Sequence, residues 1–99
     1  MAGRRRNVLE AQISMTLTAR ELELLRDETF ADPEYADRFG ESRGRCVAGF
    51  TASELDDILG HVAAAANHAP RAKLREELEA LYERLEVLEP GRAVSDEAF

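Results

Sequence analysis

The sequence predicts a small, mainly α-helical protein with one N-terminal β-strand. Three observations predict this class: two threonine–glutamate helix starts, a leucine repeat with helical spacing, and one stretch in which apolar and polar residues alternate. The 99 residues suffice for one domain and leave no room for a second. We expect this domain over residues 8–90, between a flexible basic arm at 1–7 and a flexible tail at 91–99.

Apolar and polar residues alternate from Val8 to Leu17. This period of two is typical of a half-buried strand. A single strand needs a partner, and the internal candidate is Arg45–Phe50. The alternative partner is the same strand of a second copy, which would make a dimer. The sequence leaves both pairings open.

Two helix starts carry a threonine followed three residues later by a glutamate, at Thr18–Glu21 and at Thr51–Glu54. In such a capping box, each side chain satisfies a backbone N–H of the other residue. The pattern predicts one helix over Ala19–Phe30 and another over Ala52–Ala66.

Two further helices follow from proline positions. Asp32 can cap a short helix over Pro33–Phe39, and Glu41–Gly44 is then predicted to be a polar loop. The last helix is predicted over Pro70–Glu89, after a turn at 67–70. Because this turn is short, we expect the last two helices to form a C-terminal antiparallel hairpin.

Leucines on the last helix are spaced four and three residues apart in turn, as in a coiled-coil seam. Two heptads are short for an isolated coiled coil, so the stripe is expected to pack within one chain, with self-association as the alternative. The leucines are Leu74, Leu78, Leu81, Leu85 and Leu88.

The net charge of −7 is concentrated in the second half of the chain, where residues 51–99 hold 5 basic and 11 acidic side chains. Phosphate binding needs clustered lysine and arginine, so this half is not expected to bind nucleic acid. An acidic face favours a partner protein with a basic surface, or serves solubility alone. The expected partner-binding residues are Glu76, Glu79, Tyr82, Glu83 and Glu86.

The N-terminal strand supports an alternative function. Residues 8–30 resemble the ribbon-helix-helix arrangement, which implies a DNA-binding transcriptional regulator or antitoxin-like dimer whose paired strands enter the major groove. The segment between the two capped helices is longer than that compact fold has. The candidate DNA-binding residues are Arg4, Arg5, Arg6, Gln12, Ser14 and Thr16.

A third function class follows from acidity alone. An acidic surface can imitate a nucleic-acid backbone, and the protein would then inhibit a DNA- or RNA-binding protein.

No pattern predicts catalysis, a cofactor or a metal site. His61 and His68 do not match a ligand spacing, and Cys46 has no paired histidine and acid. A lone cysteine fits a reducing compartment, and no apolar run is long enough to span a membrane, so we expect a cytoplasmic protein. The working hypothesis is a non-enzymatic interaction or regulatory module that acts through its acidic helical hairpin as a homodimer.

Overall fold

The structure is a computed structural model, and it describes residues 12–89. The predicted arm at 1–7 and tail at 91–99 lie outside the described residues. The elements in chain order are β1 (Ile13–Leu17), α2 (Ala19–Asp27), α3 (Pro33–Asp37), β2 (Gly40–Ser42), β3 (Arg45–Phe50), α4 (Ala52–Asn67) and α5 (Ala72–Glu86).

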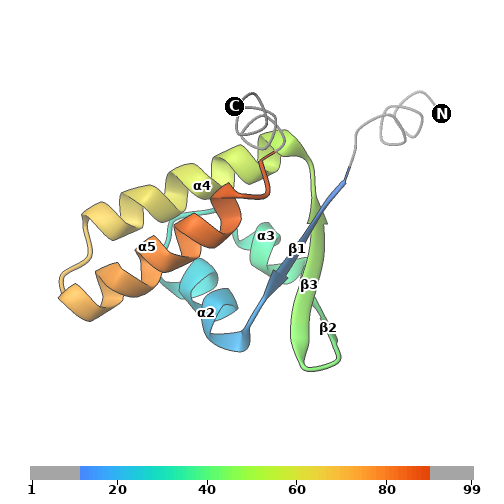
Figure 1. Ribbon diagram of the computed structural model, residues 1–99, viewed down its shortest axis with the longest axis horizontal. Helices are drawn as coiled ribbons and strands as arrows, with labels where there is room; N and C mark the ends of the chain where they lie inside the picture. Colours follow the sequence, from blue (N-terminus) through green and yellow to red (C-terminus); the bar gives the residue numbers. More distant parts are fainter. Residues whose placement is uncertain (1–11, 90–99) are drawn as a thin grey trace, which may run out of the picture.

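The fold is mixed, which corrects the prediction of a mainly α protein. Of the described residues, 58% are helical and 18% belong to a three-stranded antiparallel sheet with the order β1-β3-β2. In Figure 1, α4 and α5 lie side by side, and the sheet stands at one end of the helical layer. The additional β structure consists of β2 and of β3, with which β1 pairs within its own chain.

Strand β1 pairs with β3, so the structure shows the internal one of the two pairings that the sequence left open. The register places Ile13 opposite Phe50 and Leu17 opposite Cys46. Met15 and Leu17 are fully buried, whereas Ser14 is exposed, as the alternation predicts. The first part of the predicted strand, residues 8–11, lies outside the described residues.

Strand β2 replaces the polar loop predicted over Glu41–Gly44. The turn to β3 has positive φ at both central residues, 53° at Arg43 and 78° at Gly44. Positive φ at both positions is what a tight type I′ hairpin turn requires, and glycine adopts it without strain. All three residues of β2 are exposed, so no apolar alternation marks the strand in the sequence.

Helix ends differ from the predicted ones by a few residues. Helix α2 ends at Asp27 rather than Phe30, because the Thr29 hydroxyl donates to the Leu25 carbonyl (2.7 Å) and accepts from the Ala31 N–H (3.2 Å). This local arrangement competes with continuing the helix. Helix α3 ends at Asp37 rather than at Phe39, and α5 covers Ala72–Glu86 rather than Pro70–Glu89.

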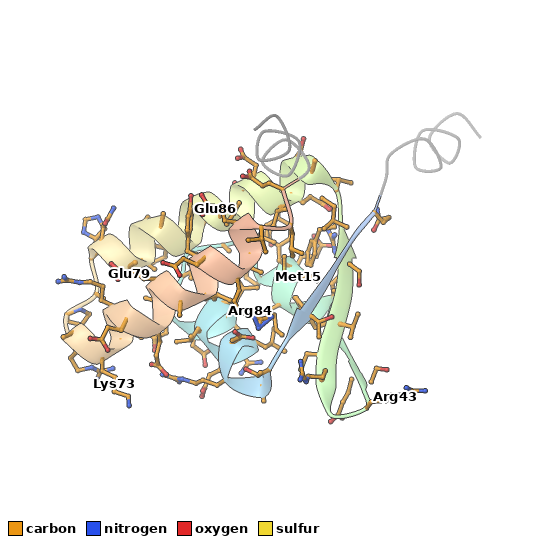
Figure 2. The ribbon with its side chains drawn as sticks, in the orientation of Figure 1. Met15, Arg43, Lys73, Glu79, Arg84 and Glu86 are labelled. Atoms are coloured by element: carbon orange, nitrogen blue, oxygen red, sulfur yellow. The ribbon has the colours of Figure 1, made fainter. Side chains whose placement is uncertain are left out.

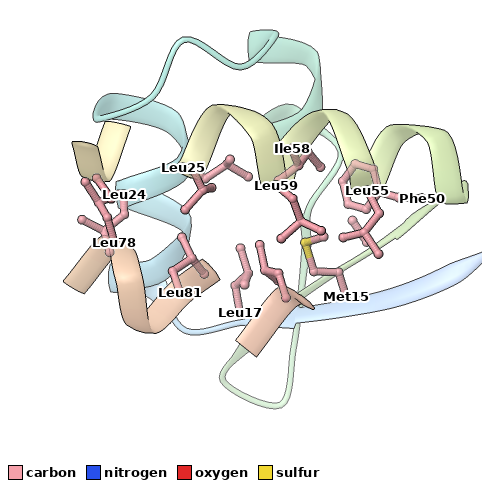
Figure 3. Packing of buried hydrophobic residues seen from close by; sticks show 14 of the residues in the cluster. Met15, Leu17, Leu24, Leu25, Phe50, Leu55, Ile58, Leu59, Leu78 and Leu81 are labelled. Atoms are coloured by element: carbon pink, nitrogen blue, oxygen red, sulfur yellow. The ribbon is translucent and has the colours of Figure 1, made fainter. Parts of the chain in front are cut away.

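The hydrophobic core lies between the inner face of the sheet and helices α2, α4 and α5 (Figure 3). The leucine stripe belongs to this core: Leu74, Leu78, Leu81 and Leu85 are each at most 5% exposed, and Leu88 is partly buried against them. The prediction that the stripe packs within one chain is confirmed. Those leucines are therefore not available as a seam between two chains.

Both predicted capping boxes are present. At α4, the Glu54 N–H donates to the Thr51 hydroxyl (3.2 Å) and the Thr51 N–H donates to the Glu54 carboxylate (2.9 Å). At α2, Thr18 and Glu21 make the same pair of bonds at 3.1 and 2.9 Å. The local sequence therefore determines where these two helices begin.

Thr51→Ala is expected to lower the free energy of unfolding by about 1 kcal/mol, because it removes the acceptor for one N–H of the first turn. Urea unfolding followed by circular dichroism measures the loss. The matched control is Ser53→Ala, which removes an exposed hydroxyl two residues after Thr51. It is expected to change the free energy of unfolding by a few tenths of a kcal/mol. Equal losses in both variants would contradict a capping role for Thr51.

Candidate protein-interaction surface

Helix α5 carries the predicted contact residues, and arginines attach it to α2 and β1. The Arg20 guanidinium donates to both carboxylate oxygens of Glu77, at 2.8 and 3.1 Å. The Arg84 guanidinium contacts the Glu21 carboxylate at 3.1 Å and donates to the Thr16 carbonyl at 2.7 Å. The buried leucines of α5 face the core, so the side of the helix away from them faces solvent.

Three glutamates form an acidic stripe on that solvent side: Glu76, Glu79 and Glu83. All three are exposed, and within residues 12–89 no salt bridge involves any of them. Their spacing of three and four residues puts them on one helix face about 10 Å long. Glu86 and Tyr82 follow the same face but are half-buried.

Glu77 contrasts with this stripe although it is next to Glu76 in the chain. Its hydrogen bonds from Arg20 hold the pKa of the Glu77 carboxyl below its usual value. The charge of Glu77 is thus compensated inside the molecule, while the charges of the acidic stripe are not. Glu77 differs from its neighbour Glu76 because successive residues of a helix point about 100° apart, so only Glu77 faces Arg20.

A hollow of about 220 Å³ opens between α4 and α5 beside the acidic stripe. Figure 2 shows Glu79 and Glu86 on the α5 side of this helix pair. The hollow is lined by Ala63, Ala66, Asn67, Glu79, Tyr82 and Glu83. Two methyl groups, an aromatic ring, an amide and two carboxylates surround it.

This combination suits the side chain of an arginine or lysine from another molecule. The alanine methyls can contact the aliphatic stem, the Tyr82 ring can contact the cation, and the carboxylates can accept its hydrogen bonds. The structure thus places three of the five predicted residues, Glu79, Tyr82 and Glu83, around the hollow. Glu76 lies further along the same face and does not line the hollow.

Sequence reasoning did not find the α4 side of the hollow, formed by Ala63, Ala66 and Asn67. The sequence indicates this side of the hollow only in part, because the run of small residues at 63–66 shows that this end of α4 is narrow. A narrow helix end becomes a hollow only where a larger side chain faces it, and here that side chain is Tyr82.

The candidate DNA-binding residues lie elsewhere. Gln12 and Ser14 are exposed and Thr16 is half-buried, all beside the outer face of the sheet. The Gln12 amide lies over Gly49, and a Cβ built there would lie 2.6 Å from the Gln12 side-chain oxygen, which a small shift of that flexible side chain would relieve. Arg4, Arg5 and Arg6 lie outside the described residues, and the DNA-binding alternative stays a prediction.

Two further arginines lie near this sheet surface, although the sequence did not indicate them as candidate DNA-binding residues. Arg43 and Arg45 are exposed at the β2–β3 hairpin. Arg43 was predicted to lie in the polar loop over Glu41–Gly44, and Arg45 was predicted to begin the candidate strand Arg45–Phe50.

The remaining titratable residues do not assemble into a metal site in the part of the chain that the structure describes. His61 lies 3.7 Å from Asp57, His68 is exposed at the end of α4, and Cys46 is a half-buried free thiol. No group of three or more histidine, cysteine, aspartate or glutamate side chains in residues 12–89 could hold a metal ion. Over the same residues, the structure has no helix of the length and apolarity that crossing a membrane would take.

Comparisons of the chain with protein-family models, with curated proteins and with solved structures found no match. The functional argument therefore depends on the geometry and charge of the residues described above.

Proposed function

We propose that this protein is a non-enzymatic interaction module, cytoplasmic and homodimeric, that binds a basic segment of a partner protein. The binding surface is the acidic stripe together with the hollow between the paired helices α4 and α5. One observation carries the proposal: the three glutamates of the stripe have no salt bridge within residues 12–89, whereas Glu77 and Glu21 each pair with an arginine. Uncompensated like charges repel one another and favour a partner of opposite charge.

The hollow adds selectivity to this electrostatic attraction. Exposed ion pairs alone contribute little affinity and mainly steer the encounter. A cation that also contacts the Tyr82 ring and the alanine methyls loses more of its contact with water and binds more strongly. We therefore expect the partner to present one arginine or lysine to the hollow and one or two further cations to the stripe.

A variant that combines Glu76→Gln, Glu79→Gln and Glu83→Gln is expected to bind a short arginine peptide at least about tenfold more weakly. The amides keep the shape and remove the charge that attracts the peptide. Isothermal titration calorimetry at low and at physiological salt measures the affinity, and the difference between variants should shrink as salt increases.

The matched control removes the same number of charges from another surface. Asp37, Glu41 and Asp56 are exposed and have no salt bridge within residues 12–89, so Asp37→Asn, Glu41→Gln and Asp56→Asn change the net charge equally. The control is expected to retain affinity within about twofold. An equal loss in both variants would mean that net charge alone attracts the peptide, and the proposal would be wrong.

A further inference from the structure

Phe30 is the most exposed large hydrophobic side chain in the described part of the chain, with 94% of its surface accessible. Its exposure follows from the local backbone. The Thr29 hydroxyl binds the Leu25 carbonyl and the Ala31 N–H, and Ala31 packs against the core. With both neighbours held, the ring of Phe30 projects outward as a knob on the surface.

An apolar groove of about 290 Å³ lies on the same side of the molecule, where the end of α2 meets the connection between α4 and α5. Phe30 forms one wall of the groove. Small and apolar side chains form most of the rest: Ala64, Ala65, Ala69, Pro70 and Leu74. Its volume and composition suit an aromatic ring.

Charges of opposite sign flank the knob and the groove. Glu28 lines the groove two residues before Phe30, and Arg71 directly follows Pro70. Neither has a salt-bridge partner among residues 12–89. Arg71 also stands at the start of α5 without a capping side chain, where a positive charge opposes the helix dipole. Within its own chain Arg71 interacts electrostatically with Glu77, which is already hydrogen-bonded to Arg20.

We propose that two copies of this chain associate through this face, with the Phe30 ring of each copy in the groove of the other. A knob and a groove on one face are self-complementary, which is the condition for a two-fold symmetric contact. The same symmetry brings the acidic end of α2 in one copy to the basic start of α5 in the other. The occupant of the groove is therefore a second copy.

The structure closes one of the two dimer contacts that the sequence left open, because the leucine stripe is buried in its own chain. Strand β1 is an edge strand that pairs with β3 on one side, and Arg84 binds its Thr16 carbonyl. The groove shares no lining residue with the hollow between α4 and α5. A dimer through the Phe30 face therefore leaves both hollows open, and its test is independent of the partner-binding proposal.

Light scattering of the full chain from micromolar to millimolar concentration tests the proposal. We expect the mass to rise from 11.0 kDa toward twice that value. Phe30→Ser removes the knob and Ala64→Lys fills the groove, and each should raise the dissociation constant at least about tenfold. Val87→Ser is the control, because Val87 is 65% exposed but does not line the groove, and it should leave the constant within about twofold.

Mixing the two variants separates this contact from nonspecific association. A pair formed by one Phe30→Ser chain and one Ala64→Lys chain retains one intact knob and one open groove that lacks only its own Phe30 wall, so the mixture should associate more strongly than either variant alone. A wild-type chain that stays monomeric overturns the proposal. So does a dimer that Phe30→Ser does not weaken, or one that Val87→Ser weakens equally.

Discussion

Phe50→Ala is expected to lower the free energy of unfolding by about 3–5 kcal/mol. Phe50 is fully buried at the end of β3, and its ring centroid lies 5.8 Å from that of Tyr35 and 5.6 Å from that of Phe39. The Arg38 guanidinium lies over the same ring, 4.8 Å from its centroid. The substitution thus removes apolar contacts and a cation–π contact at once, and it leaves a cavity.

Chemical unfolding in urea measures this loss, and the matched control is Phe30→Ala. Phe30 is 94% exposed, so at low protein concentration its removal should change the stability by less than about 0.5 kcal/mol. Domains of this size are stable by only about 5–15 kcal/mol, so the expected loss in Phe50→Ala is at least about a fifth of the total stability. A loss below about 1 kcal/mol would show that the Phe50 ring is not the centre of this packing.

Glu54→Gln is expected to lower the free energy of unfolding by about 2 kcal/mol at neutral pH. The Arg38 guanidinium donates to both Glu54 oxygens, at 2.9 and 2.8 Å, and the Thr51 N–H donates to the same carboxylate. These bonds lower the pKa of Glu54 from 4.5 to about 2. Both side chains of the ion pair are 28% exposed, so solvent screening reduces the corresponding stabilisation to about 2 kcal/mol.

The pH dependence follows from the direction of that shift. The pKa of Glu54 is lower in the folded state than in the unfolded state, so its contribution is complete above pH 4.5 and is lost as the pH falls toward about 2. The stability difference between wild type and Glu54→Gln should therefore shrink over this interval. Urea unfolding at a series of pH values measures it.

Glu34→Gln is the control for the same arginine. Glu34 also pairs with Arg38, at 3.2 Å, but its side chain is 63% exposed, so its removal should change the stability by less than about 0.5 kcal/mol. If both variants lose the same stability, or if the loss in Glu54→Gln is independent of pH, then the charge of Glu54 does not stabilise the fold.

The two capped helices could be predicted because a capping box is local. Each box joins residues three positions apart, and both predicted starts are confirmed. The same glutamates have a second role that is not local. Glu21 also binds Arg84, 63 residues away, and Glu54 also binds Arg38. Nothing in the order of residues pairs one particular arginine with one particular glutamate over such a separation.

The sheet could be predicted only in part. The buried side of β1 alternates regularly, so the strand and its partner β3 were within reach of the sequence. Strand β2 has no buried side chain, and its hydrogen bonds to β3 depend on a turn at Arg43 and Gly44. Periodicity detects burial, and a strand that buries nothing gives no such signal.

The candidate interaction surface, like the sheet, could be predicted only in part. Helical spacing alone places Glu76, Glu79 and Glu83 on one face, and the charge pattern alone identifies them as acidic. The hollow beside them needs α4 opposite α5, because Ala63 and Tyr82 come from different helices. Likewise, Phe30 was predicted as the last residue of a helix, and only the packed turn makes it an exposed knob.

By itself, therefore, the sequence determined where α2 and α4 begin, which leucines of α5 enter the core, and which face of α5 is acidic. These features depend on interactions within about one helical turn or on the period of burial. Tertiary structure decided that the fold is mixed, which glutamates are paired, and where the hollow and the groove lie. Those features arise where side chains from separate elements meet, and their energies depend on distances that the chain order does not contain.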